Sequence, residues 1–126
     1  MTDPPKTLVW MGSSRRDLAD LPEDARRQLG IALFWAQKGA THPDAKPMGA
    51  QLRGVTEIVA DHAGDTYRVM YNARIGEVVY VLHAFQKKSK RGITTPQAEI
   101  DLIVKRLKDA REHHKQQPRI DAGGKS

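Results

Sequence analysis

Two basic side chains in the second half of the sequence are placed where they could hold a phosphate group. Arg68 lies within one apolar stretch, and Lys87 directly follows another. The planar guanidinium of arginine can donate two parallel hydrogen bonds to a phosphate, and lysine supplies a compact positive charge. We expect the two side chains to share one neighbourhood if the stretches form adjacent strands. The alternative is that Arg68 forms an ion pair and that Lys87 begins a solvated loop.

More basic residues follow Lys87 without an acidic one among them. The segment 86–94 also contains Lys88, Lys90 and Arg91. Such a run can contact the backbone of a nucleic acid, although charged loops are often only solvated. Arg53, alone in an earlier loop, is a further candidate for contact with a polyanion. A lone arginine in a loop is more often simply solvated.

The net charge has the same uneven distribution. The chain of 126 residues carries a formal charge of +6. Residues 1–62 contain eight basic and eight acidic side chains, whereas residues 63–126 contain thirteen basic and seven acidic ones. This asymmetry is typical of a surface that binds a polyanion. The alternative is that lysine and arginine only keep the C-terminal part soluble.

His83 is the one histidine inside an apolar stretch. Its ordinary pKa near neutrality would let it donate a proton to a leaving group. A buried, hydrogen-bonded histidine is the commoner case, and we favour it here. Strand alternation predicts that His83 lies on the same side as Val79, Val81 and Phe85.

Tyrosines offer a second route to proton transfer or to base stacking. Tyr67 and Tyr71 share one face of their stretch, and packing explains them equally well. We expect Trp10, Phe34 and Trp35 to belong to the core.

Several classes of site and location are not expected. The sequence has no cysteine, which excludes disulfides and cysteine-ligated zinc. Neighbouring histidines on a helix point about 100° apart, so His113 and His114 do not predict a metal site. We expect no cofactor. No stretch approaches the roughly 20 apolar residues of a membrane span, and the N-terminus lacks a secretory pattern. A cytoplasmic protein is therefore expected.

The elements that must position these residues follow from periodicity and turn signals. Apolar stripes at helical spacing predict helices over 22–38 and 96–115, with a short helical turn over 15–21. Strands are expected over 7–11, 55–61, 66–73 and 78–85. Short turns make the last three strands antiparallel and set Thr66–Arg68 opposite roughly Phe85–Lys87. We predict one α+β domain over 1–115 and a disordered tail over 116–126.

Three motifs resemble a known family. They are Tyr67-Arg68-Val69-Met70-Tyr71, the run Leu82-His83-Ala84-Phe85-Gln86-Lys87-Lys88, and Thr95-Pro96-Gln97-Ala98-Glu99-Ile100 before an amphipathic helix. Together they are similar to the phage-derived, HigB-like branch of the RelE toxins, and the similarity extends over nearly the whole chain.

The resemblance implies a RelE-like fold, with two N-terminal helices on one face of a small antiparallel sheet and a C-terminal helix near the other. It also implies the toxin of a type II toxin–antitoxin system, a metal-independent endoribonuclease that cleaves mRNA on the ribosome. A cognate antitoxin with a helix-turn-helix domain is the expected partner, and DNA is contacted only through it.

The roles implied for the candidate residues are as follows. Arg68 and Lys87 would contact the scissile phosphate, and His83 or Tyr71 would carry protons. Arg53, Lys88, Lys90 and Arg91 would hold mRNA or ribosomal RNA. Some relatives use a C-terminal tyrosine or a histidine–glutamate pair, but the final helix here has no tyrosine and offers only Glu112, His113 and His114. The general base therefore stays open.

Two other functions remain compatible with these patterns. One is a non-catalytic RNA- or ribosome-binding module that blocks translation by occupancy. The other is an inactive toxin-fold protein that acts in autoregulation with its antitoxin.

Overall fold

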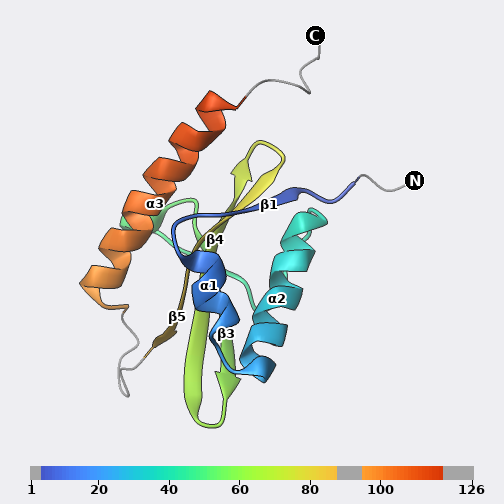
Figure 1. The fold of residues 1–126 in the computed structure, drawn as a ribbon, viewed down its shortest axis with the longest axis vertical. Helices are drawn as coiled ribbons and strands as arrows, with labels where there is room; N and C mark the ends of the chain where they lie inside the picture. The colour runs from blue at the N-terminus through green and yellow to red at the C-terminus, as the bar shows by residue number, and fades with distance from the viewer. Residues whose placement is uncertain (1–3, 88–94, 118–126) are drawn as a thin grey trace.

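The computed structural model describes residues 4–87 and 95–117. A five-stranded sheet lies between the helices, and Figure 1 shows the arrangement. The strand order is β1-β5-β4-β3-β2. The elements are β1 (Thr7–Trp10), α1 (Ser14–Ala19), α2 (Glu23–Gln37), β2 (Lys46–Pro47), the 3₁₀ turn η1 (Ala50–Leu52), β3 (Thr56–His62), β4 (Asp65–Ile75), β5 (Val78–Lys87) and α3 (Gln97–Gln116). The α+β fold class expected from the sequence is confirmed.

Short turns join β3, β4 and β5 into the expected antiparallel meander. The β3–β4 turn consists of Ala63 and Gly64, whose φ angles of 52° and 86° are both in the left-handed region, as tight hairpin turns require. Thr66 pairs with Lys87 and Arg68 with Phe85, so the predicted register is confirmed. The sheet as a whole is mixed rather than purely antiparallel, because β1 pairs in parallel with β5.

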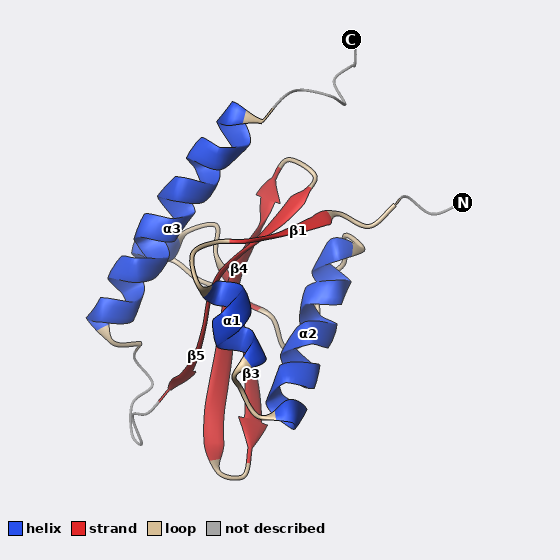
Figure 2. Cartoon of the chain, viewed as in Figure 1, coloured by secondary structure: helices blue, strands red, loops and turns tan. Residues whose placement is uncertain are grey.

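The two faces of the sheet are covered by different helices. Figure 2 shows α1 and α2 on one side of the strands and α3 on the other. The first layer buries a cluster that contains Leu29, Leu33 and Val69, and the second buries one that contains Met70 and Ile103. Helical spacing in the sequence predicted both buried stripes, because each helix needs one apolar face against the sheet.

One prediction about the core is wrong. Phe34 and Trp35 lie on the outer face of α2, where they are 53% and 38% exposed. The buried stripe of this helix runs through Leu33 and Ala36, so the two positions between them point away from the sheet. Trp10 does pack against the core cluster beneath α1 and α2.

The C-terminal helix ends at Gln116. The predicted tail 116–126 lies outside the described residues from position 118 onwards. Within the described part of the chain, no helix is long and apolar enough to cross a bilayer.

Candidate functional site

Arg68 and Lys87 lie on the face of the sheet that α3 covers. Met70, two residues after Arg68 on β4, belongs to the core cluster beneath α3, so alternation directs Arg68 to the same side. Phe85, opposite Arg68 on β5, belongs to this cluster too, and Lys87 follows it by two positions. The sheet therefore brings together the two basic residues that the sequence singled out.

Glu57 on β3 forms an ion pair with Arg68. Its carboxylate accepts a hydrogen bond from Nη1 of Arg68. The side chain of Glu57 is 4% exposed and that of Arg68 is 13% exposed. A charge pair with so little solvent around it has a well-defined geometry, because each charge would be costly to bury alone. The sequence offered an ion pair as the alternative interpretation of Arg68, and the structure shows this ion pair. It lies on the same face of the sheet as Lys87.

Lys87 is buried although its ammonium has no ion-pair partner among the described residues. It is 6% exposed, and within residues 4–87 and 95–117 its Nζ finds no hydrogen-bond acceptor. Burial lowers the pKa of Lys87 below the ordinary lysine value, and the positive charge of Arg68 lowers it further. The carboxylate of Glu57 partly opposes this shift in pKa. An anionic ligand at this position would supply the missing partner.

His83 also lies on the α3 face, and it shares this side with Phe85, as strand alternation predicts. Met70 pairs with His83 and the next residue, Tyr71, with Val81, so a β-bulge leaves Leu82 without an opposite residue. Beyond this bulge the alternation is reversed. The prediction that His83 shares a side with Val79 and Val81 is wrong, because these two pack beneath α1 and α2.

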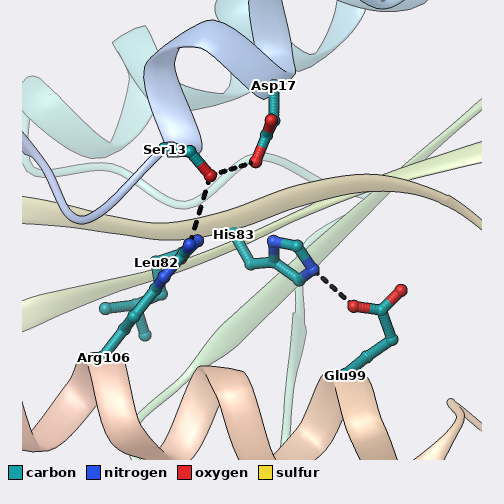
Figure 3. A network of polar contacts seen from close by, with 6 residues as sticks. All are labelled: Ser13, Asp17, Leu82, His83, Glu99 and Arg106. Atoms are coloured by element: carbon teal, nitrogen blue, oxygen red, sulfur yellow. Dashed lines mark hydrogen bonds and ion pairs between the residues drawn. The ribbon is translucent and has the colours of Figure 1, made fainter.

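The ring of His83 is held between two neighbours. Nε2 lies 2.6 Å from Oε1 of Glu99 in the first turn of α3. Figure 3 shows the ring directed at this carboxylate. A carboxylate only accepts, so Nε2 carries the proton and donates it. The ring stacks on Phe85 with centroids 4.6 Å apart. Nδ1 has no partner among the described residues, which leaves one ring nitrogen of a buried, oriented histidine available.

Arg106 connects α3 to the bulged part of β5. Its Nη1 donates to the carbonyl of Leu82 at 2.9 Å, and its Nη2 donates to Oγ of Ser13 at 3.2 Å (Figure 3). Ser13 in turn donates to the carboxylate of Asp17 in α1. This network joins α1, β5 and α3, and thereby fixes the helix that carries Glu99.

A pocket of about 520 Å³ opens beside Arg68 and Glu57. The segment 46–52 forms one wall, and Thr95 and Ile100 at the start of α3 form another. Its volume is within the usual range of sites for small ligands.

The family of the chain becomes clear when its sequence is compared with known proteins. The model of the family described as phage-derived protein Gp49-like (DUF891) matches residues 16–108. The chain belongs to this Gp49-like family. The match confirms the phage-derived family that the motifs indicated.

Comparisons with solved structures and with curated proteins add little to this family match. A chain of the crystal structure of the toxin–antitoxin complex RelBE2 from Mycobacterium tuberculosis is 24% identical to this Gp49-like chain. The alignment covers 69% of this chain and 100% of that one, with a TM-score of 0.42. No curated protein matches the sequence.

Not every predicted site residue of the Gp49-like chain joins the cluster. Tyr71 lies on the opposite face of the sheet, packed with Tyr67 beneath α1 and α2. Burial raises the pKa of the Tyr71 hydroxyl, and a side-chain hydrogen bond with Thr56 only partly opposes the rise. Its odd spacing from Arg68 explains the separation, because residues three apart on a regular strand face opposite ways. The structure therefore does not group Tyr71 with Arg68 and Lys87.

The other basic residues proposed to contact RNA are not found in the cluster of Arg68 and Lys87 within the described part of the chain. Arg53 is exposed and directly follows η1, but it does not line the pocket. Lys88, Lys90 and Arg91 lie outside the described residues. Within the described ranges, no three histidine, aspartate or glutamate side chains gather closely enough to hold a metal ion.

Sequence reasoning missed both acidic residues of the cluster. Glu57 is the second residue of β3, and its pairing with Arg68 depends on the β3–β4 register. Glu99 lies within the Thr95–Ile100 motif, but its contact with His83 spans 16 residues of sequence. An acidic residue at an otherwise apolar strand position was the available signal for Glu57.

Proposed function

We propose that this chain is the toxin of a type II toxin–antitoxin system and acts as a metal-independent endoribonuclease on translated mRNA. The observation that carries the proposal is the cluster of Arg68, Lys87 and His83 on one rigid face of the sheet, beside a pocket. Membership of the Gp49-like family and the motif resemblance to HigB-like toxins support it.

The proposed reaction is attack of a ribose 2′-oxygen on the adjacent phosphorus. The bond from phosphorus to the 5′-oxygen breaks, the 2′-hydroxyl loses a proton and the leaving oxygen gains one. Arg68 and Lys87 supply fixed positive charge for the phosphate, which gains negative charge in the transition state. Since burial holds these charges in place, little reorganisation is needed when the charge develops.

Three groups of the cluster are able to exchange protons, and one of them, Lys87, also belongs to the phosphate-binding pair. Glu57 is a carboxylate next to Arg68, and Lys87 has a lowered pKa that increases the fraction of neutral amine at a given pH. His83 has its Nε2 fixed by Glu99 and its Nδ1 without a partner among the described residues. Glu57 and His83 sit opposite the same residue, Met70, from the two strands beside it. They thus lie on either side of the middle strand. Glu57 can accept a proton as a base, and His83 can donate one from Nδ1 when both of its ring nitrogens are protonated.

The proposed partners follow from the family resemblance. Ribosome-bound mRNA is the substrate, and a cognate antitoxin, with a helix-turn-helix domain that contacts DNA, neutralises the toxin. The proposed location is the cytoplasm, where translation takes place.

The test is induced expression in a bacterial host, with growth and mRNA 5′ ends followed together. Wild-type protein should arrest growth and produce new 5′ ends within translated messages. The Arg68→Lys variant keeps the charge but loses the guanidinium fork, and should produce far fewer cuts. Arg15→Lys, an exposed position on α1 across the sheet, is the matched control and should cut like the wild type.

The other outcomes decide between the remaining functions. Arrest without new 5′ ends would contradict cleavage and support blockage of translation by occupancy. Normal growth with soluble, abundant protein would contradict both and support a regulatory role.

A further inference from the structure

The pocket beside Arg68 has both apolar and polar side chains in its lining. Met48, Leu52 and Ile100 contribute apolar side chains to its lining, and Leu52 is 4% exposed. Gln51 and Thr95 add an amide and a hydroxyl. A flat ring with hydrogen-bonding groups at its edge fits such a lining, because the faces need apolar contact and the edge needs donors and acceptors.

Charged groups are part of the same pocket. Arg68, Lys46 and Glu57 line it, so its charges sum to one net positive. The pocket would therefore favour a ligand in which an anionic group is attached to the flat ring. A nucleotide combines both features, with an apolar-faced base and a phosphate joined through a sugar.

The loop that forms the pocket wall has a defined shape. Ala50 has a φ of 52°, a left-handed conformation that alanine adopts only where its surroundings enforce it. Backbone hydrogen bonds from Leu52 to Gly49 and from Met48 to Val55 close the loop on itself. The buried side chain of Asn72 donates to the carbonyl of Gly54 at 2.7 Å and anchors the end of the loop to β4. The cavity is thus preformed.

We infer that this pocket binds one unstacked nucleobase of the RNA strand whose phosphate Arg68 contacts, and that Gln51 reads the edge of that base. The inference rests on the proposed function for the identity of the substrate. The amide of Gln51 presents a donor and an acceptor together, the combination that discriminates between base edges. A base drawn out of the stack in this way fixes the adjacent phosphate against Arg68.

The structure offers a matched pair of variants to test the pocket. Gly49 lines it with a φ of −124°, and a Cβ added there meets nothing within 4 Å. The side chain added by Gly49→Leu should therefore occupy the pocket without straining the backbone. It has no aromatic ring that could stack on a base. Gly30 on α2 is equally open to a Cβ but lies on the helix across the sheet, so Gly30→Leu is the control.

The probes are adenosine, cytidine, guanosine and uridine 3′-monophosphates, titrated into the full-length protein and followed by amide chemical shifts. Inorganic phosphate is titrated separately. At least one nucleotide should bind more tightly than inorganic phosphate, with shifts in the 46–52 loop. Gly49→Leu should weaken that binding at least about fivefold, and Gln51→Ala should reduce the difference between the four bases. Gly30→Leu should change neither.

Binding no tighter than inorganic phosphate, or unaffected by Gly49→Leu, would overturn the inference. So would shifts confined to other parts of the chain. These outcomes do not depend on cleavage in cells. A protein that cuts mRNA but leaves the pocket empty would refute the base site alone, and one that binds a base without cutting would refute only the nuclease.

Discussion

Because Glu57 forms an ion pair with Arg68, a phosphate must compete with the Glu57 carboxylate for the Arg68 guanidinium. In the free protein the guanidinium is already engaged by a buried carboxylate, while its Nε has no partner among the described residues. A phosphate that approaches Arg68 meets the guanidinium donors that Glu57 leaves unpaired, together with the negative charge of Glu57. Glu57 thus limits the affinity for anions while it holds the guanidinium in the orientation that binding needs.

Replacing Glu57 with glutamine should strengthen RNA binding. The amide still accepts a hydrogen bond from Arg68, but a negative charge disappears from the site. Removing a repulsion of roughly 1 kcal/mol predicts binding about fivefold tighter. Affinity for a short single-stranded RNA, measured by fluorescence anisotropy, checks this.

Asp61→Asn is the matched control, since it removes the same charge from an exposed position on the same strand. It should change the affinity less. Weaker binding by the Glu57→Gln protein would contradict the competition, and would show that the ionised carboxylate is needed to orient Arg68.

The buried ammonium of Lys87 should cost stability. Its pKa is lowered in the folded state, so below the folded pKa both folded and unfolded chains are protonated and the cost is fully present. As the pH rises from the folded pKa towards the unfolded value near 10.5, the folded protein releases its proton first and becomes relatively more stable. Lys87→Met should therefore stabilise the protein at pH 7 by about 1–3 kcal/mol.

Chemical unfolding at pH 7 and at pH 10 measures this effect. The gain from Lys87→Met should shrink at the higher pH, whereas Lys105→Met, at a side chain that is 71% exposed, should change little at either. A loss of stability at pH 7 would show that the ammonium is satisfied in solution.

Whether a contact of the site can be predicted from the sequence depends on how far apart in the sequence its residues lie. Arg68 and Lys87 could be paired from the sequence because short turns and a period of two fix a hairpin register locally. The contact of His83 with Glu99 could not, since it needs the bulge at Leu82 and the position of a helix that lies across the sheet. A bulge has no reliable signature in one sequence, and it reverses every later alternation.

At the scale of the elements, α3 depends on Arg106 for its position. The half-buried guanidinium joins the bulge carbonyl of Leu82 to Ser13 before α1. Added to the apolar stripe of the helix, these contacts set its rotation, and with it the approach of Glu99 to His83.

Arg106→Met should keep the aliphatic contacts and lose both hydrogen bonds. Bonds to a charged donor contribute about 1.5–3 kcal/mol each, and the Leu82 carbonyl would be left without this donor. We expect the free energy of unfolding to fall by at least about 3 kcal/mol, measured by urea denaturation. Arg111→Met, at an exposed position on the same helix, is the control. Equal effects of the two substitutions would contradict a special role of Arg106.

The elements themselves were predictable to different degrees. The long helices and the meander strands follow from strong periodicity and were located within a few residues. The two-residue strand β2 and the turn η1 lie in a stretch that the sequence marks only as a loop, because glycine and proline dominate it. Likewise, no local signal gives the parallel pairing of β1 with β5, which joins residues about seventy positions apart.

For the whole molecule, the sheet separates two surfaces with different roles. The face beneath α1 and α2 is a packed core, whereas the α3 face combines a core with the charged cluster and the pocket. Arg68 and Lys87, two basic residues of the second half of the chain, lie on the latter face. RNA binding should accordingly depend on charges of that face and not on basic residues elsewhere.

The salt dependence of RNA binding tests this one-sidedness. Each phosphate neutralised on a single strand contributes about −0.7 to the slope of log affinity against log salt concentration. Arg68→Gln alone would leave Glu57 buried without its partner, so the substitution is made together with Glu57→Gln and compared with the Glu57→Gln protein. The slope of the double variant should be shallower by about 0.7.

The control is Arg15→Gln in the same Glu57→Gln background. It removes one positive charge from α1, on the other side of the sheet, and should leave the slope unchanged. Equal changes for Arg68 and Arg15 would mean that net charge alone attracts the RNA, and that the cluster around Arg68 does not contact phosphate.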